Sequence, residues 1–125
     1  MKITRFEDIK AWQEARILTK MVYEAINKNS NFKKDIRLFS QIQSASGSVM
    51  ANIAEGFVRH SDKEFIQFLF IAMSSAAEVQ SHLYIALDRD YIMSSDFDKI
   101  YSQADKTAKM ISSFIKYLRS SGKTR

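Results

Sequence analysis

Apolar residues recur along this chain at intervals of three and four positions, in four stretches separated by short polar breaks. The first stretch extends from about Phe6 to Asn27. Its apolar positions are Ile9, Trp12, Ala15, Leu18, Val22, Ala25 and Ile26. Because an α-helix turns once in about 3.6 residues, this spacing puts them on one side and predicts an amphipathic helix. Thr4 and Glu7, three residues apart, are a candidate capping box at its start.

The same spacing predicts three more helices. The second covers about residues 34–57, after a polar break that contains strong turn residues. The third begins at Ser61, which is a good capping residue with Glu64 three positions later. The fourth begins at Ser95 and ends at Gly122, a natural helix terminator.

Four amphipathic helices joined by short turns pack most simply as an antiparallel up-down-up-down four-helix bundle. We therefore predict an all-α fold in a single domain, residues 1–125. The chain has no proline and only three glycines, and a fold rich in β-turns would need more of both. Gly47 lies inside the second predicted helix, where glycine costs about 1 kcal/mol against alanine. We expect a neighbouring helix or another subunit to approach its backbone closely.

Composition predicts a cytoplasmic protein. The chain has no cysteine, so it has neither a disulfide framework nor a thiolate zinc site. Residues 1–8 lack the apolar core of a signal peptide, and no apolar run approaches the roughly 20 residues that span a bilayer. We expect no membrane association.

The formal net charge of +5 is unevenly distributed. Residues 1–34 carry +4, residues 35–95 carry −3 and residues 96–125 carry +4. In the predicted bundle the first and fourth helices are neighbours, so the two basic ends of the chain share a surface. Basic surfaces attract phosphate backbones. The candidate nucleic-acid contacts on these helices are Lys10, Arg16, Lys20, Lys99, Lys106, Lys109 and Lys116. The alternative is that these lysines only keep the surface soluble.

A second basic cluster, Arg59, His60 and Lys63, lies at the turn before the third predicted helix. The amino end of a helix favours anions, so Arg59 and Lys63 are further candidates for phosphate contact. The alternative is a solvated turn. The aromatic residues do not show the alternation with basic residues that single-strand binders normally have, and Trp12 fits core packing better than base stacking.

The sequence predicts no catalytic, cofactor-binding or metal-ligating residue. A di-iron bundle needs Glu-x-x-His on two helices, whereas Glu78 and His82 are four apart and no second pair exists. We interpret His82 as a partly exposed helix residue and His60 as a turn residue. There is no cysteine nucleophile, no Gly-x-Ser-x-Gly elbow and no glycine-rich phosphate loop. We therefore expect a protein that is not an enzyme.

Three polar residues on helix surfaces are candidates for assembly or interhelix contacts: Asn52, Glu55 and Glu78. One reading pairs Glu55 with Arg59 and hydrogen-bonds Asn52 to another helix. The other places Asn52 and Glu55 at a subunit contact or a central pore, where buried polar groups fix register. Glu78 lies beside small residues, and its carboxylate could cross to a basic residue of another chain.

The segment 48–57, Ser-Val-Met-Ala-Asn-Ile-Ala-Glu-Gly-Phe, resembles the "S-I-P-x-N-I-A-E-G" signature of the 23S rRNA intervening-sequence proteins. Phe6-Glu7-Asp8-Ile9, Phe65 and Asp90-Tyr91-Ile92 are also similar to that family, which is related to accessory proteins of diversity-generating retroelements and includes proteins named S23 ribosomal proteins. The resemblance implies a bacterial four-helix bundle that assembles as a homopentameric ring. It also implies nucleic-acid binding on a positive surface.

Two positions depart from the family pattern. Met50 replaces the proline of the signature, and Gln43-Ser44 replaces a common basic pair. Nucleic acid would therefore be held by the first and fourth helices or by the turn between Arg59 and Lys63. Our leading hypothesis is a self-assembling accessory to RNA or a ribonucleoprotein, with DNA as a possible ligand. The alternative is an adaptor or scaffold ring that binds a partner protein and no nucleic acid.

Overall fold

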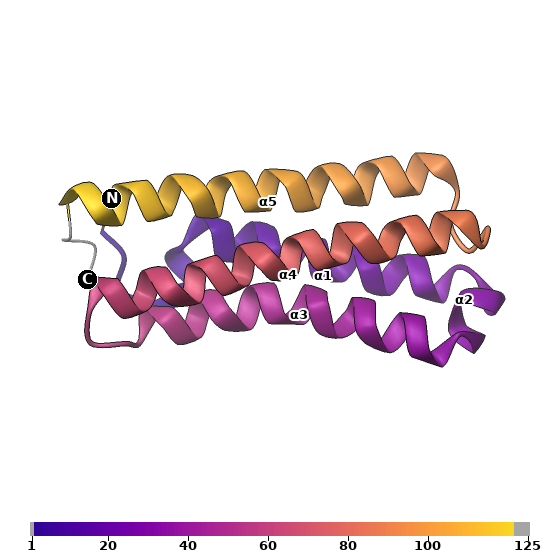
Figure 1. The fold of residues 1–125 in the computed structure, drawn as a ribbon, viewed down its shortest axis with the longest axis horizontal. Helices are drawn as coiled ribbons and strands as arrows, with labels where there is room; N and C mark the ends of the chain where they lie inside the picture. The colour runs from indigo at the N-terminus through magenta and orange to yellow at the C-terminus, as the bar shows by residue number, and fades with distance from the viewer. Residues whose placement is uncertain (1, 122–125) are drawn as a thin grey trace.

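The structure, a computed structural model, describes residues 2–121 and is all-helical over that range, without a strand. The elements in order are the 3-10 helix η1 (Phe6–Asp8), α1 (Lys10–Asn27), α2 (Ser30–Lys34), α3 (Ile36–Phe57), α4 (Asp62–Asp88) and α5 (Ser94–Ser121). Figure 1 shows α1, α3, α4 and α5 lying lengthwise beside one another, with the chain reversing at each connection. The predicted terminator Gly122 lies outside the described residues.

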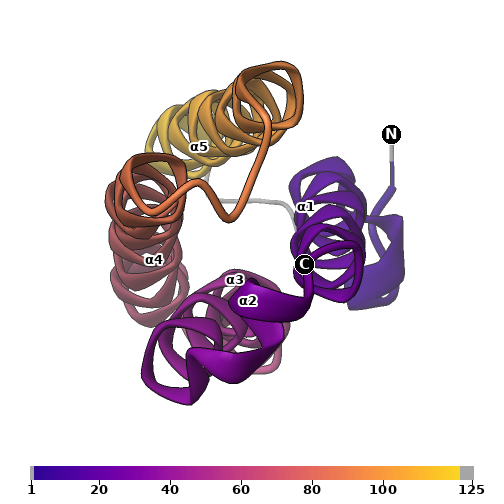
Figure 2. The same ribbon diagram turned by 90° about the vertical axis from the view of Figure 1, so that its right-hand side faces the viewer.

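The four long helices form a helical bundle in which each one contacts two others. α3 packs against α1 and α4, and α5 packs against α4 and α1. The end-on view in Figure 2 shows the same arrangement, with α5 and α3 on opposite sides of the interior. The two basic segments of the sequence, α1 and α5, are therefore neighbours, as expected.

The interior consists of two clusters of buried apolar side chains along the bundle axis. One is centred on residues such as Leu18, Ile42 and Leu83, and the other on residues such as Ile53 and Phe65. Burying each of these side chains contributes roughly 1.5–3 kcal/mol. Small residues that are also buried allow the helix backbones to approach: Ala15, Ala45, Ala72, Ala76, Ala86 and Ala104. Trp12 packs against the second cluster, which confirms its predicted place in the core.

The short helix α2 was not predicted. The Asn29 side chain caps it by accepting a hydrogen bond from the Phe32 amide at 2.9 Å, and the Phe32 ring is buried against Tyr91. The Tyr91 hydroxyl donates to Asp35 at 3.0 Å, and Asp35 also caps α3 by accepting from the Leu38 amide. These contacts tie the α1–α3 connection to the α4–α5 connection.

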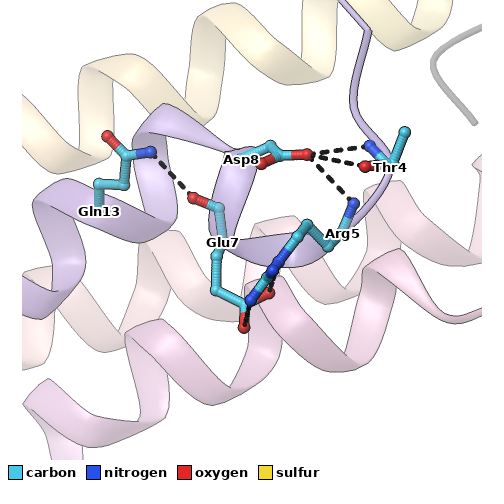
Figure 3. Close-up of polar contacts among 5 residues, drawn as sticks. All are labelled: Thr4, Arg5, Glu7, Asp8 and Gln13. Atoms are coloured by element: carbon cyan, nitrogen blue, oxygen red, sulfur yellow. Dashed lines mark hydrogen bonds and ion pairs between the residues drawn. The ribbon is translucent and has the colours of Figure 1, made fainter.

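The N-terminal segment is held by a small polar network, drawn in Figure 3, that differs from the predicted capping box. Asp8, not Glu7, is the acceptor: its carboxylate takes hydrogen bonds from the Thr4 amide at 3.1 Å and the Thr4 hydroxyl at 3.2 Å. The bond from the Thr4 amide lowers the pKa of the Asp8 carboxyl. Glu7 pairs with Arg5 at 2.8 Å, and the Gln13 amide donates to the Glu7 carbonyl. The predicted cap at Ser61 is confirmed, since its hydroxyl accepts from the Glu64 amide.

The close backbone approach expected at Gly47 occurs instead at Gly56 within the protomer. A Cβ built on Gly47 meets no atom within 4 Å, so no neighbouring helix of the described chain approaches it. A Cβ at Gly56 would lie 2.8 Å from both Phe65 Cδ1 and Phe68 Cβ. The glycine at the end of α3 therefore lets α4 fold back closely. In the described part of the chain, the helices are too short or too polar to cross a membrane.

Candidate nucleic-acid interface

All nine basic residues proposed from the sequence have exposed side chains. Seven of them lie on α1 and α5: Lys10, Arg16, Lys20, Lys99, Lys106, Lys109 and Lys116. Because α1 and α5 are in contact, segments from both ends of the sequence lie side by side in the bundle.

Three of these lysines surround a single groove. It lies between the start of α1, with the N-terminal segment beside it, and the part of α5 from Tyr101 to Tyr117, and its volume is about 1000 Å³. Lys10 approaches from α1, and Lys106 and Lys109 approach from α5. We call this feature the α1–α5 groove.

The walls of the α1–α5 groove are mainly apolar. Ile3 and Ile9 form one side, and Met110, Phe114 and Tyr117 form the other. The Phe114 and Tyr117 rings are nearly parallel, at 11°, with centroids 6.3 Å apart. Sequence reasoning missed this wall, because Ile3 belongs to a segment that is not helical and reaches α5 only in the folded chain.

Acidic residues of the same chain pair with two of the groove lysines, which the sequence reasoning also missed. Lys106 lies 3.3 Å from Glu14, and Lys109 lies 3.1 Å from Asp105. The Gln103 amide donates to both the backbone carbonyl and the carboxylate of Glu14, each at 2.9 Å. The hydrogen bond from Gln103, together with Lys106, lowers the pKa of the Glu14 carboxyl. Glu14 therefore stays ionised at neutral pH and reduces the positive potential beside Lys106.

The other basic residues on α1 and α5 do not line the groove. Lys99 shares a shallow depression with Lys106 and Met21. Arg16, Lys20 and Lys116 are exposed on the same two helices, outside the groove lining. Arg16 is three residues from Thr19, which hydrogen-bonds Ser46 of α3, so Arg16 lies toward the α3 side of α1 rather than beside α5.

Arg59 and Lys63 lie apart from the α1–α5 groove and do not line it. Arg59 is in the connection from α3 to α4, and Lys63 is in the first turn of α4. The Arg59 guanidinium, which one reading of the sequence placed against Glu55, lies over the Phe68 ring at 4.6 Å from its centroid. His60 is exposed in the same turn, as expected.

Asn52, one of the polar residues proposed for assembly, has its partners within its own helix. The Asn52 amide donates to the Ser48 carbonyl at 2.8 Å and to the Ser48 hydroxyl at 2.9 Å, both within α3, so the expected bond to another helix is wrong. Ser48 makes the interhelix link, because it accepts from the Ser75 hydroxyl of α4 at 3.0 Å. Glu55 is exposed.

Glu78 is also exposed, and its carboxylate lies 3.6 Å from the half-buried ring of His82. Among residues 2–121, no group of three His, Cys, Asp or Glu side chains is arranged to hold a metal ion.

Glu78 lies within an outward stripe of α4 that is otherwise uncharged. Its residues follow one another at alternating intervals of four and three positions, and all are exposed: Gln67, Ile71, Ser74, Glu78, Ser81 and Ile85. Between Phe65 and Leu87 the only Asp, Glu, Lys or Arg is Glu78. We call this stripe the α4 face. The α4 face thus combines two exposed isoleucines, Ile71 and Ile85, with four polar residues.

The fold and the family were compared with known proteins. A crystal structure of a protein of unknown function from the S23 ribosomal protein family of Bacteroides thetaiotaomicron is similar, with a TM-score of 0.76. It is 24% identical, and the likeness covers 85% of this chain and 98% of that one, which shows the shared fold. Comparison with curated proteins gave no match. The model of the 23S rRNA-intervening sequence protein family matches residues 7–113, from η1 into the last third of α5. The chain therefore belongs to the family of 23S rRNA-intervening sequence proteins.

Proposed function

We propose that this protein is a non-enzymatic, self-assembling helical bundle of the cytoplasm. It associates with nucleic acid, mainly RNA, and acts as an accessory to RNA or a ribonucleoprotein. The observation that carries the proposal is the meeting of α1 and α5. Lysines from opposite ends of the sequence, Lys10, Lys106 and Lys109, surround one groove there. Contacts of lysines with phosphates carry little base information, so the proposal includes no sequence specificity from these residues.

The proposed scaffold is an antiparallel up-down-up-down four-helix bundle that associates with copies of itself, as a pentamer by family resemblance. The α4 face supports self-association, because Ile71 and Ile85 are exposed on a stripe with a single charged residue. Small side chains at Ser74 and Ser81 would let a second helix come close.

A salt titration of RNA binding tests the proposal. Binding should be measurable at about 50 mM salt and should weaken steeply by about 200 mM, because each phosphate contact releases counterions. The double variant Lys10→Glu with Lys109→Glu should weaken binding and make the salt slope shallower by about one for each lysine–phosphate pair that it removes. The matched control is Lys33→Glu with Lys34→Glu, the same double charge reversal at exposed positions on α2. Absence of binding at low salt, or affinity indifferent to salt, contradicts the proposal.

A second function, a protein–protein adaptor without nucleic-acid binding, is favoured by the α4 face alone. Its exposed isoleucines fit a partner protein as well as a second copy of this chain. In that case a pull-down after nuclease treatment recovers one partner in fixed stoichiometry. The Lys10→Glu and Lys109→Glu changes would leave that partner bound, which separates the two functions.

A further inference from the structure

The α1–α5 groove contains more apolar surface than phosphate binding explains. Lysines alone suffice to hold a phosphate backbone, and they need no cavity of about 1000 Å³ beneath them. Yet Ile3, Ile9, Met110, Phe114 and Tyr117 line that space. Its volume is at the upper end of the range of roughly 300–1000 Å³ that is usual for small-molecule sites.

We propose that the α1–α5 groove receives unpaired bases of a single strand, while the phosphates of that strand contact Lys10, Lys106 and Lys109. This inference rests on the proposed function and narrows its ligand to single-stranded nucleic acid. A duplex keeps its bases stacked inside and presents mainly phosphates, so it would leave the apolar walls exposed to water.

The aromatic pair at one end of the groove provides the stacking surface. Tyr117 is 46% exposed, and its ring is nearly parallel to that of Phe114. Tyr101 lines the groove farther along α5. Its phenol is protonated at neutral pH, as tyrosine phenols ordinarily are, and the neighbouring Tyr84 raises its pKa further. Stacking of bases on aromatic side chains, flanked by cations, is the usual way in which single strands are bound without sequence preference.

The charge of the rim favours a polyanion. Lys10, Lys106 and Lys109 contribute three positive charges, and Asp105 is the one acidic residue in the lining. The Lys109–Asp105 pair joins two exposed side chains, and such pairs are worth only about 0–1 kcal/mol. Lys106 is itself exposed, although its partner Glu14 is mostly buried. Each paired ammonium keeps further N–H donors, so a phosphate can bind beside the acid.

The test compares three probes of about 12 nucleotides: a single strand of mixed sequence, the same backbone without bases, and a duplex. We expect the native strand to bind at least about tenfold more tightly than the abasic strand. Tyr117→Leu should weaken binding of the native strand by about 5- to 150-fold and leave the abasic strand unaffected. Tyr23→Leu is the matched control, because Tyr23 is also 46% exposed but lies on α1 outside the groove.

A second variant tests the inference without changing Tyr117 or the side chains packed against it. Ser113 is an exposed residue of the groove lining, so Ser113→Trp fills the groove while leaving the core side chains in place. It should reduce the preference for the native strand over the abasic strand. Equal affinity for both strands, unchanged by either variant, overturns the inference and leaves a phosphate-only interface. That result would instead favour an amphipathic peptide as the occupant. If none of the probes binds at low salt, the proposed function itself fails.

Discussion

At Gly56 the backbone of α3 lies close against α4, and a methyl group there has no room. Its Cβ would lie 2.8 Å from Phe65 Cδ1 and 3.2 Å from the Phe65 carbonyl oxygen. We expect Gly56→Ala to lower the free energy of unfolding by about 1–3 kcal/mol, the usual cost of overpacking. Gly47→Ala is the control, since its Cβ meets no atom within 4 Å and should add up to about 1 kcal/mol of stability. Urea denaturation measures both. A Gly56→Ala protein as stable as the native one would show that α4 can move away at little cost.

Glu14 makes stability depend on pH in the acid range. Its pKa is lowered in the folded protein by Gln103 and Lys106, so its stabilisation is complete above the pKa of the unfolded chain, near about 4.3. That contribution is lost as the pH falls through the lower pKa of the folded state. We expect Glu14→Gln to reduce the free energy of unfolding by about 1 kcal/mol at pH 7. The difference from the native protein should shrink as the pH falls below about 4.3 and vanish only below the lower pKa of the folded state. A difference that is constant from pH 7 to about pH 3 would assign the effect to packing.

At the scale of elements, the contact between Tyr91 and Asp35 joins two connections at one end of the bundle. Tyr91→Phe keeps the stacking on Phe32 and removes only the hydroxyl, so it should cost about 0.5–1.5 kcal/mol. Asp35→Ala removes this bond and also the cap on the Leu38 amide, so it should cost more. Thermal or urea unfolding of both single variants and the double variant gives the coupling energy. A coupling near zero would show that the hydroxyl is as well satisfied by water.

The long helices were predictable and the short one was not, for a physical reason. A stripe such as Leu18, Val22 and Ala25 repeats over several turns, and the requirement to bury it determines the helix. α2 has five residues, which is too few for a periodic pattern, and depends on the Asn29 cap and on burial of Phe32. The hydrogen bonds at the start of the chain could not be predicted from the sequence either. Thr4 has two acids within reach in the sequence, and only the path of the folded backbone selects Asp8.

At the scale of the whole molecule, part of the candidate interface followed from the sequence and part required the fold. In an antiparallel bundle the order of the helices makes α1 and α5 neighbours, so it was predictable that Lys10 would lie near Lys106 and Lys109. The pairing of Lys106 with Glu14 was not, because it depends on how far α5 is shifted along α1. The apolar groove between these lysines likewise depends on the N-terminal segment folding against α5.

The α4 face makes a prediction about assembly. Ile71 is 49% exposed in the protomer, so Ile71→Glu removes little packing within one copy and places a second negative charge about two helix turns from Glu78. If copies associate through this face, burying that charge at the interface is costly, and the variant should be monomeric while keeping its helical content. Sedimentation or light scattering gives the mass, and circular dichroism gives the helicity.

Ile17→Glu supplies the comparison, because Ile17 is 45% exposed on α1 and the substitution is chemically identical. It should leave the mass of the assembly unchanged. If both variants keep the native mass, copies do not meet through the α4 face; if both become monomeric, the effect follows from added charge rather than from a particular surface. The interface is assigned to α4 only if Ile71→Glu is monomeric and Ile17→Glu keeps the native mass. Assembly through α4 would leave the α1–α5 groove, elsewhere on the bundle, open for a nucleic-acid strand.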